Sequence, residues 1–379
     1  MSYRVQSVIA TAFLIGMVAV AGKLYQGNPG VSSRAMVSLP HPEPFTVRYQ
    51  VDAMTLREKI GQMFMVSFAG PELAEETVSW MRDHEIGGVI LLGGNIVSKE
   101  QTKKLIDDLQ KKVGEKTAAP LFIAVDQEGG VVSRFTFEDY ELQSQREIKD
   151  ATDAYAVAFK RGKELHELGV TVNFSPVVDI SSSTKDFIYD RTFTGDAETV
   201  GTYGAAMING YRDGGVASVA KHFPGHGDTS VDSHANLPIA PRGENAWRMH
   251  LMPFEAAVDA KVPMIMSAHL KVPSIDKVFP ASLSKIILTD ILRNGLGFKG
   301  VIVSDDLGMG ALSNNYSFSE IALRAVEAGT DVLLVVRTSA IYEKMFRAIE
   351  DAVEQGVIKE ERIDESVIRI LSLKHELTK

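Results

Sequence analysis

The chain has 379 residues, of which 45% are hydrophobic and 23% are charged, an ordinary composition for a globular protein. Its 40 basic and 49 acidic residues give a net charge of −9 without a long basic run. Nucleic acid is therefore not an expected partner, because phosphate binding needs clustered Lys and Arg. The absence of cysteine excludes disulfides, thiolate metal ligands and cysteine nucleophiles.

The N-terminus has the pattern of a secretory signal. Arg4 precedes an uncharged apolar run from Val8 to Ala21, and this run ends in small residues typical of a cleavage site. The run is short for a membrane span, which usually needs about 20 apolar residues. We expect a signal peptide or signal-anchor at residues 1–22, followed by a Gly-, Ser- and Pro-rich linker at residues 23–50. The protein is then exported, periplasmic or extracellular, with membrane contact only through an uncleaved N-terminal anchor.

From Leu56 onward, short apolar runs alternate with longer helical patterns. The runs are nearly continuous in apolar residues, as expected of parallel strands that are covered on both faces. We predict strands at Met63–Phe68, Gly88–Leu92, Leu121–Asp126, Thr171–Phe174, Val216–His222, Met264–Ala268, Val301–Ser304 and Val332–Val336. Helical patterns lie between them, for example at Lys99–Lys116, Ala151–Leu168, Ala197–Arg212, Asn245–Ala260 and Ile321–Ala328.

Eight strands, each followed by a helical pattern, are the count of a closed barrel. We therefore predict an α/β fold in which residues 51–379 form a single (β/α)8 TIM barrel. A doubly wound open sheet is the alternative, because closure cannot be read from one sequence.

Titratable side chains gather where the predicted strands end. The third strand ends in Asp126-Gln-Glu-Gly-Gly130, the fifth continues into the loop Lys221–His234, and the seventh ends in Ser304-Asp-Asp306. In a barrel, the loops after the strands carry the chemistry. Such a concentration of acids and histidines therefore predicts an active site at this end of the barrel.

Asp305 directly follows the seventh strand, so it is expected to project toward the barrel axis. A strand-end Asp can also cap the helix that follows. Because two consecutive Asp residues are present, we predict that Asp305 points inward and that Asp306 has the structural role.

In the loop after the fifth strand, Asp232 and His234 are separated by one residue, so in an extended stretch they lie on the same side. A carboxylate beside an imidazole fixes its tautomer and raises its basicity. Since an unperturbed His titrates near pH ~6.5, such a pair can donate and accept a proton near neutrality.

At these residues the sequence resembles glycoside hydrolase family 3, in its bacterial β-N-acetylglucosaminidase (NagZ-type) branch. The resemblance covers essentially all of Leu56 to Val336. It is carried by Leu56-Arg-Glu-Lys-Ile-Gly-Gln62, Gly87-Gly-Val-Ile-Leu-Leu92, Asp126-Gln-Glu-Gly-Gly130, Lys221 through His234, and Val301-Ile-Val-Ser-Asp-Asp-Leu307.

The resemblance implies a retaining β-N-acetylglucosaminidase that removes terminal β-linked N-acetylglucosamine, from peptidoglycan-derived muropeptides. It implies that Asp305 is the nucleophile and that His234 is the acid/base, with Asp232 as its partner. Cofactors and metals are not expected, the partner is a small carbohydrate, and the protein is expected to be a monomer. The implied sugar-binding positions are Asp126, Arg134, Arg191, Lys221 and His222.

Three alternatives remain open at this point. A β-N-acetylglucosaminide phosphorylase would use the same site with phosphate in place of water. A metal-dependent hydrolase would use His222, His226, Asp228 and His234 as ligands. An inactive wall-binding protein is the third, although a chemically competent residue occupies every proposed catalytic position.

Overall fold

The computed structural model of the chain describes residues 45–240, 243–336 and 339–378. Eight parallel strands form one sheet in the order β7-β6-β5-β4-β3-β2-β1-β8. All strand residues are buried, in keeping with the apolar runs that predict them. The strands are β1 (Phe64–Val66), β2 (Gly88–Leu91), β3 (Phe122–Val125), β4 (Val172–Asn173), β5 (Ala217–Phe223), β6 (Met264–Ser267), β7 (Val301–Ser304) and β8 (Leu333–Val335).

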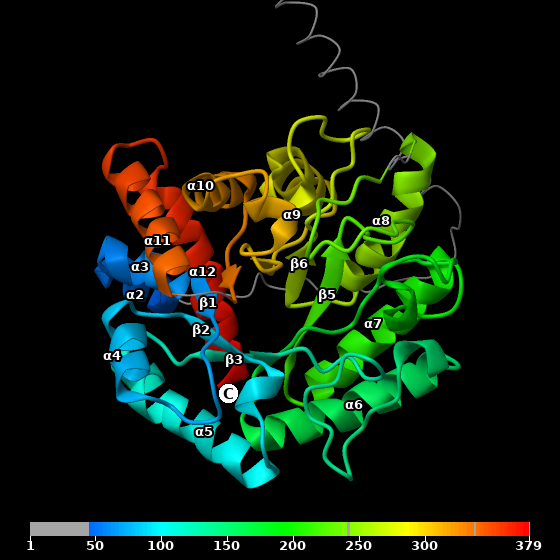
Figure 1. Cartoon of the computed structure of the whole chain (residues 1–379), viewed down its shortest axis with the longest axis horizontal. Coiled ribbons are helices and arrows are strands. Elements are labelled where there is room, and N and C mark those ends of the chain that lie inside the picture. Colours follow the sequence, from blue (N-terminus) through cyan, green and yellow to red (C-terminus); the bar gives the residue numbers. More distant parts are fainter. Residues whose placement is uncertain (1–44, 241–242, 337–338, 379) are drawn as a thin grey trace, which may run out of the picture. The chain divides into compact units, whose positions relative to one another are not determined.

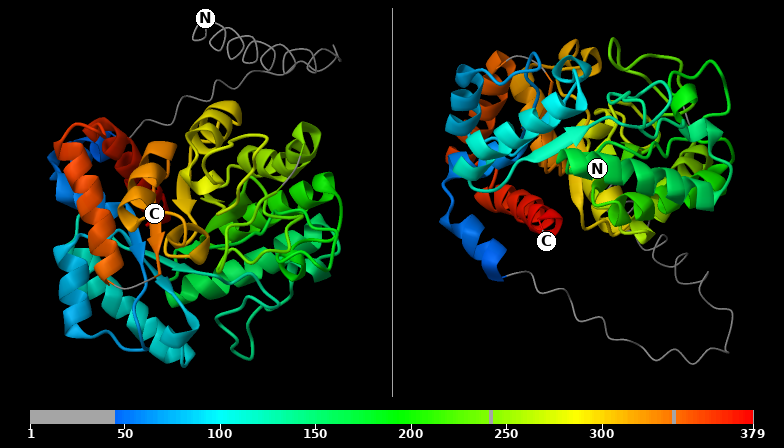
Figure 2. Two further views of the ribbon diagram at one scale, coloured as in Figure 1. Left: turned by 45° about the horizontal axis from the view of Figure 1, so that its top comes forward. Right: turned by 90° about the horizontal axis from the view of Figure 1, so that it is seen from below.

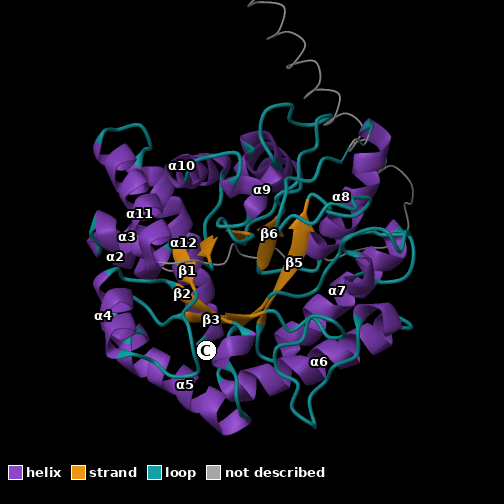
Figure 3. Ribbon diagram, in the orientation of Figure 1, coloured by secondary structure: helices purple, strands orange, loops and turns teal. Residues whose placement is uncertain are grey.

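The two ends of this sheet meet, so the sheet is a closed barrel. Val303 and Val332 form a parallel bridge between β7 and β8. The backbone N–H of Ser304 donates to the carbonyl of Val332 at 2.9 Å, and that of Asp331 donates to the carbonyl of Ile302 at 2.8 Å. Figure 3 shows the strands enclosed by helices. The predicted (β/α)8 barrel is confirmed, and the doubly wound open sheet is excluded.

Helical segments follow every strand and surround the barrel (Figure 1). The predicted helices are present with small shifts of their ends. For example, the segment predicted at Lys99–Lys116 is a helix to Lys112 and then a short 3-10 turn. The helices are α2 (Phe45–Ala53), α3 (Leu56–Gln62), α4 (Glu75–Asp83), α5 (Lys99–Lys112), α6 (Ala151–Leu168), α7 (Ala197–Asp213), α8 (Glu244–Asp259), η6 (Ile286–Gly295), α9 (Gly310–Ser313), α10 (Phe318–Ala328), α11 (Ser339–Glu354) and α12 (Glu360–Leu377).

Helix α2 includes residues 45–50, which the composition predicts as the end of a linker. Val47 and Val51, one turn apart, are fully buried in the core. The helix packs beside α12, which also contacts α3 (Figure 2). Residues 45–50 therefore belong to the folded domain and not to a linker. The predicted signal at residues 1–22 lies outside the described residues, and none of the described helices is long and apolar enough to cross a membrane.

A buried lysine lies between the C-terminal helix and the start of β3. Lys374 of α12 is 3% exposed, and its Nζ donates to Oε1 of Gln62 at 2.7 Å. The same Nζ lies 5.1 Å from the ring centroid of Phe122. Burial lowers the pKa of Lys374 to about 7, because the charged ammonium is poorly solvated there.

Candidate active site

A cavity of about 140 Å³ lies at the C-terminal ends of the strands, where a barrel carries its chemistry. Its lining comes from segments at the ends of β3 to β8. Seven of the predicted site residues line it: Asp126, Arg134, Arg191, Lys221, His222, His234 and Asp305. Asp232 does not line the cavity, but it contacts His234, which does.

Two cations and two carboxylates form a buried network on one side of the cavity. Nζ of Lys221, in β5, lies 2.6 Å from Oδ1 of Asp126 and 2.6 Å from Oε1 of Glu128. Arg191 binds Glu128 with two parallel hydrogen bonds of 2.7 and 2.9 Å. Burial raises the pKa of Glu128, but the charges of Arg191 and Lys221 outweigh it and hold this pKa well below its usual range.

The backbone after β3 makes this network possible. Gly129 has φ +89°, a conformation that other residues rarely adopt, and a Cβ there would lie 2.1 Å from the carbonyl oxygen of Gln143. The turn therefore needs glycine. The buried guanidinium of Arg161 donates to the carbonyl oxygens of Glu128 and Gln143, each at 2.8 Å, so it ties the two segments together.

A second buried carboxylate orients two histidines. Oδ2 of Asp179 accepts from Nδ1 of His222 at 2.7 Å, and Oδ1 accepts from the backbone N–H of His226 at 2.6 Å. Arg191 approaches Nε2 of His222 at 3.4 Å. Burial raises the pKa of Asp179, but the neighbouring imidazoles of His222 and His226 outweigh it and lower this pKa. The side chain of Asp179 thus fixes the start of the long loop after β5.

Asp305 follows β7 and lies at the cavity, as predicted. Its Oδ1 accepts from the backbone N–H of Asp306 at 2.8 Å. Burial is the largest single effect on the pKa of Asp305, and it raises this pKa. The nearby His269, His222, the N–H of Asp306 and Lys221 together outweigh burial, so the pKa of Asp305 lies below its ordinary value. The carboxyl is therefore ionised at neutral pH and able to act as a nucleophile.

The residues beside Asp305 support the backbone. Oδ1 of Asp306 accepts from the N–H groups of Gly308 and Val336, each at 3.0 Å. His269 is fully buried, with Nδ1 2.8 Å from Oγ of Ser282 and Nε2 2.9 Å from the carbonyl oxygen of Asp306. Since a carbonyl oxygen only accepts, Nε2 of His269 is the donor. These contacts agree with the structural role that was predicted for Asp306.

Asp232 and His234 form the predicted pair, with Nδ1 of His234 2.7 Å from Oδ1 of Asp232. Their side chains are 49% and 65% exposed. The ring of Phe187 lies edge-on to the imidazole of His234, with ring centroids 5.8 Å apart. This pair therefore lies on an exposed loop, whereas Asp305 lies at the end of a barrel strand.

The metal-ligand set suggested by the sequence is not assembled. His222 contacts Asp179, His234 contacts Asp232, and Oδ2 of Asp228 lies 2.9 Å from Nε2 of His250. Within residues 45–240, 243–336 and 339–378, no three His, Asp or Glu residues are placed to hold one ion.

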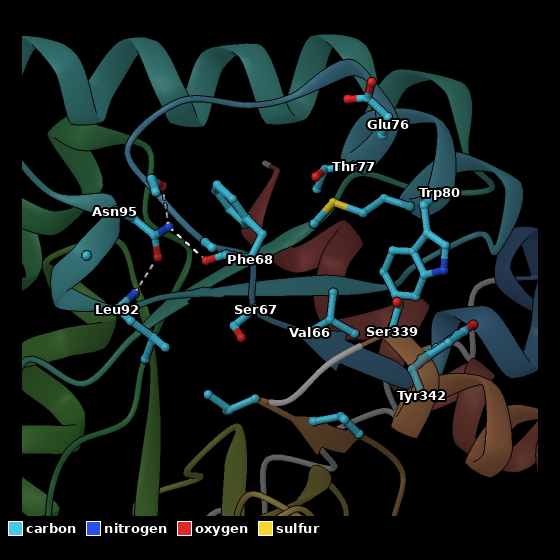
Figure 4. A pocket seen from close by; sticks show the side chains of 16 residues that line it. Val66, Ser67, Phe68, Glu76, Thr77, Trp80, Leu92, Asn95, Ser339 and Tyr342 are labelled. Atoms are coloured by element: carbon cyan, nitrogen blue, oxygen red, sulfur yellow. Dashed lines mark hydrogen bonds between the residues drawn. The ribbon is translucent and has the colours of Figure 1, made fainter.

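A larger cavity of about 930 Å³ lies between the ends of β1 and β8 and the helices α4 and α11 (Figure 4). Its walls are mainly apolar and include Phe68, Trp80 and Tyr342. Asn95 closes one side, where its Nδ2 donates to the carbonyl oxygens of Phe68 and Gly70. The acids and histidines predicted for catalysis line the smaller cavity instead, so we place the chemistry there.

No role was predicted for two residues that are central to the geometry of the site. Glu128 and Asp179 are 1% and 0% exposed and organise the cations and histidines of the site. For Glu128 a signal was present, because it lies two residues after Asp126 and just before Gly129-Gly130, where a turn places both carboxylates on one side.

Comparison of the sequence with known protein families identifies a family that covers the whole barrel. Residues 55–373 match the glycosyl hydrolase family 3 N-terminal domain. The chain belongs to glycoside hydrolase family 3.

Individual relatives differ in length from this chain. It is 35% identical to β-hexosaminidase A of Pseudoalteromonas piscicida, covering 81% of this chain and 55% of that protein. It is 31% identical to β-hexosaminidase LpqI of Mycobacterium tuberculosis, covering 98% of this chain and 97% of that one. A solved structure of a family 3 β-N-acetylglucosaminidase from Paenibacillus superposes with a TM-score of 0.83 at 38% identity, over 86% of this chain and 63% of that one. The chain thus spans just over half of one relative and nearly all of another.

Proposed function

We propose that the protein is a retaining β-N-acetylglucosaminidase that hydrolyses terminal β-linked N-acetylglucosamine. The observation that carries the proposal is the presence of a partly buried, ionised Asp305 and the exposed Asp232–His234 pair at one small cavity. Relatives named β-hexosaminidase and β-N-acetylglucosaminidase support the choice of sugar.

In the first step, a carboxylate oxygen of Asp305 attacks the anomeric carbon and the bond to the leaving oxygen breaks. Protonated His234 gives its Nε2 proton to that oxygen, since Nδ1 is held by Asp232. In the second step, water attacks the anomeric carbon and releases Asp305, while Nε2 of His234 takes the proton. Two inversions give net retention, with an imidazole in place of the second carboxyl group of the usual pair.

The remaining cavity residues hold the sugar. Asp126, Lys221 and Arg191 present charged groups to the cavity and are oriented by their contacts with each other and with Glu128. Arg134 and His222 also line it. Such groups bind hydroxyls through charge-assisted hydrogen bonds, which position the anomeric carbon in front of Asp305.

The test is hydrolysis of 4-nitrophenyl N-acetyl-β-glucosaminide by the full chain, followed by NMR. The β-anomer of N-acetylglucosamine should form first. Asp305→Asn should lower kcat at least about 10⁴-fold, because the nucleophile is lost. The matched control Asp306→Asn keeps an oxygen acceptor for Gly308 and Val336 and should retain measurable turnover. An active Asp305→Asn enzyme would contradict the assignment, and sugar 1-phosphate formed on adding phosphate would identify a phosphorylase.

We also propose that the protein is exported and acts on muropeptides derived from peptidoglycan. The support for export is the N-terminal pattern of Arg4, the apolar run from Val8 to Ala21 and its small final residues. Expression of the full chain in a bacterial host, with fractionation and mass spectrometry of the N-terminus, tests this. A full-length protein found only in the cytoplasm would argue against export, and inactivity on a purified muropeptide would argue against the substrate.

A further inference from the structure

One histidine at the cavity has a role that the mechanism above does not use. His226 is 2% exposed and lines the cavity together with Asp305 and His234. Its Nε2 atom is buried and has no hydrogen-bond partner among the described residues. A buried polar atom without a partner is costly, so a ligand group that completes its hydrogen bonding is favoured.

The neighbouring threonine determines which kind of group Nε2 can bind. Oγ1 of Thr229 lies 3.0 Å from the carbonyl oxygen of His226 and 3.2 Å from its Nδ1. A carbonyl oxygen only accepts, so the single hydroxyl proton of Thr229 goes there. Toward Nδ1 the hydroxyl oxygen is then the acceptor, and Nδ1 carries the ring proton. Burial, the largest effect, and the nearby His222 lower the pKa of His226 to about 4, which keeps the ring neutral. Nε2 therefore presents a lone pair.

Among the described residues that line the cavity, two have a buried side-chain atom without a partner. They are Nε of Arg134, which is a donor, and Nε2 of His226, which is an acceptor. The carboxylates of the cavity also accept, but Asp126 and Glu128 are bound to cations, and Asp305 is charged and accepts from the backbone N–H of Asp306. His226 is thus the unpaired neutral acceptor of this lining, and it suits a neutral N–H or O–H donor of the sugar.

The surroundings of His226 indicate which donor it meets. Its ring feels the charge of Asp305, which attacks the anomeric carbon, and its centroid lies 6.0 Å from that of His222. The ring centroid of Phe187 lies 6.1 Å from that of His226 and 5.8 Å from that of His234, so these three rings lie together at the cavity. In N-acetylglucosamine, the only N–H donor is on the carbon next to the anomeric carbon, and the anomeric carbon faces Asp305 in the proposed reaction. We propose that Nε2 of His226 accepts a hydrogen bond from the N–H of the substrate's 2-acetamido group and so makes His226 a specificity-determining residue. This inference rests on the proposed function.

The test compares two substrates that differ only in this N–H: 4-nitrophenyl N-acetyl-β-glucosaminide and its 2-O-acetyl ester analogue. His226→Phe keeps a ring but removes the acceptor. It should lower kcat/KM at least about tenfold on the amide and little on the ester, so the amide-to-ester ratio should fall at least about tenfold. His226→Gln, which keeps an acceptor oxygen, should restore part of the ratio. Equal losses on both substrates, or no loss, would overturn the proposal.

Two further variants keep the test decisive if His226→Phe does not fold. Thr229→Val removes the hydroxyl that fixes the tautomer and should lower the amide-to-ester ratio in the same direction, by a smaller factor. His250→Phe is the matched control, because His250 contacts Asp228 of the same loop without lining the cavity. It should change both substrates alike. An unchanged ratio in Thr229→Val would count against the assigned tautomer and the proposal.

The two hypotheses fail in different ways. If the wild-type enzyme hydrolyses neither substrate, the proposed function is contradicted. Calorimetry with N-acetylglucosamine then tests the contact by itself: the wild-type protein should bind the sugar at least about fivefold more tightly than His226→Phe, and the affinity of His226→Gln should lie between the two. Equal affinities, or no binding by the wild-type protein, would overturn the inference.

Discussion

Oδ1 of Asp232 accepts two hydrogen bonds from His234, one from the backbone N–H at 2.8 Å and one from the ring Nδ1 at 2.7 Å. Partial burial raises the pKa of Asp232, but these two hydrogen bonds and the charge of His234 outweigh it and lower this pKa. The double contact fixes both the tautomer and the direction of the imidazole. Nε2 is thereby the ring atom available for proton transfer on this exposed loop.

Replacing Asp232 by Asn tests the importance of this charge. The amide oxygen can still accept from the backbone of His234, but the protonated ring loses its anionic partner. We expect kcat/KM to fall about 10- to 100-fold for substrates with poor leaving groups and much less for a dinitrophenyl glycoside, which needs no proton. Rates for a series of aryl glycosides measure this. A loss that is the same for every leaving group would contradict the role in proton donation.

The buried contact between Glu128 and its two cations should stabilise the fold. Glu128→Gln leaves Arg191 and Lys221 without a carboxylate between them, so the free energy of unfolding should fall by about 3 kcal/mol. Urea denaturation measures this. The control is Glu75→Gln, which breaks an exposed ion pair with Lys112 and should cost less than about 1 kcal/mol. Similar small losses in both variants would count against a stabilising network.

Burial of Lys374 should make the stability of the protein depend on pH in the alkaline range. Its pKa is about 7 in the folded protein and ~10.4 when unfolded, so the unfolded chain binds more protons between these values. The free energy of unfolding should therefore rise as the pH rises from 7 toward 10. Lys374→Met should remove this rise and be more stable than the wild type at pH 7. Urea denaturation at pH 7 and 9.5 checks this, with the exposed Lys103→Met as control. If the free energy of unfolding changes with pH by the same amount in the wild type, Lys374→Met and Lys103→Met, the prediction is refuted.

The fold should lose stability as His226 becomes protonated at acidic pH. Its folded pKa of about 4 lies below the unfolded value of ~6.5, so the unfolded chain binds more protons in this window. Stability contributed by the neutral ring is present above pH 6.5 and is lost as the pH falls toward 4. His226→Gln should narrow the difference in unfolding free energy between pH 7 and 4.5. If this difference is the same in both proteins, His226 is not buried as a neutral ring.

Much of the fold could be predicted because each strand is a continuous apolar run, buried on both faces. Barrel closure could not, since it depends on pairing between β7 and residues 331–332, which no local pattern indicates. The start of the domain was misplaced because the composition of residues 23–50 hides the one-turn spacing of Val47 and Val51, which are buried in α2.

The site was predictable where the residue type and its place at a strand end agree. Asp305 is the clearest case, directly after β7 and at the cavity. Glu128 and Asp179 were harder to assign because their roles come from contacts with residues 43 to 93 positions away, such as His222 and Lys221. Such pairs are set by the closure of the barrel, which brings the ends of distant strands together.

The unequal enclosure of Asp305 and His234 has a consequence for the size of substrate that the proposed reaction accepts. Only a small volume, about 140 Å³, is enclosed around Asp305, whereas the side chain of His234 is 65% exposed. In the proposed function, the terminal sugar alone would have to enter, and the group attached to it would stay in bulk solvent beside the imidazole. A long glycan, a peptide-bearing fragment and a small dye are then equivalent leaving groups in steric terms. The enzyme would shorten chains one unit at a time from the outside, and the length of the chain would set no limit.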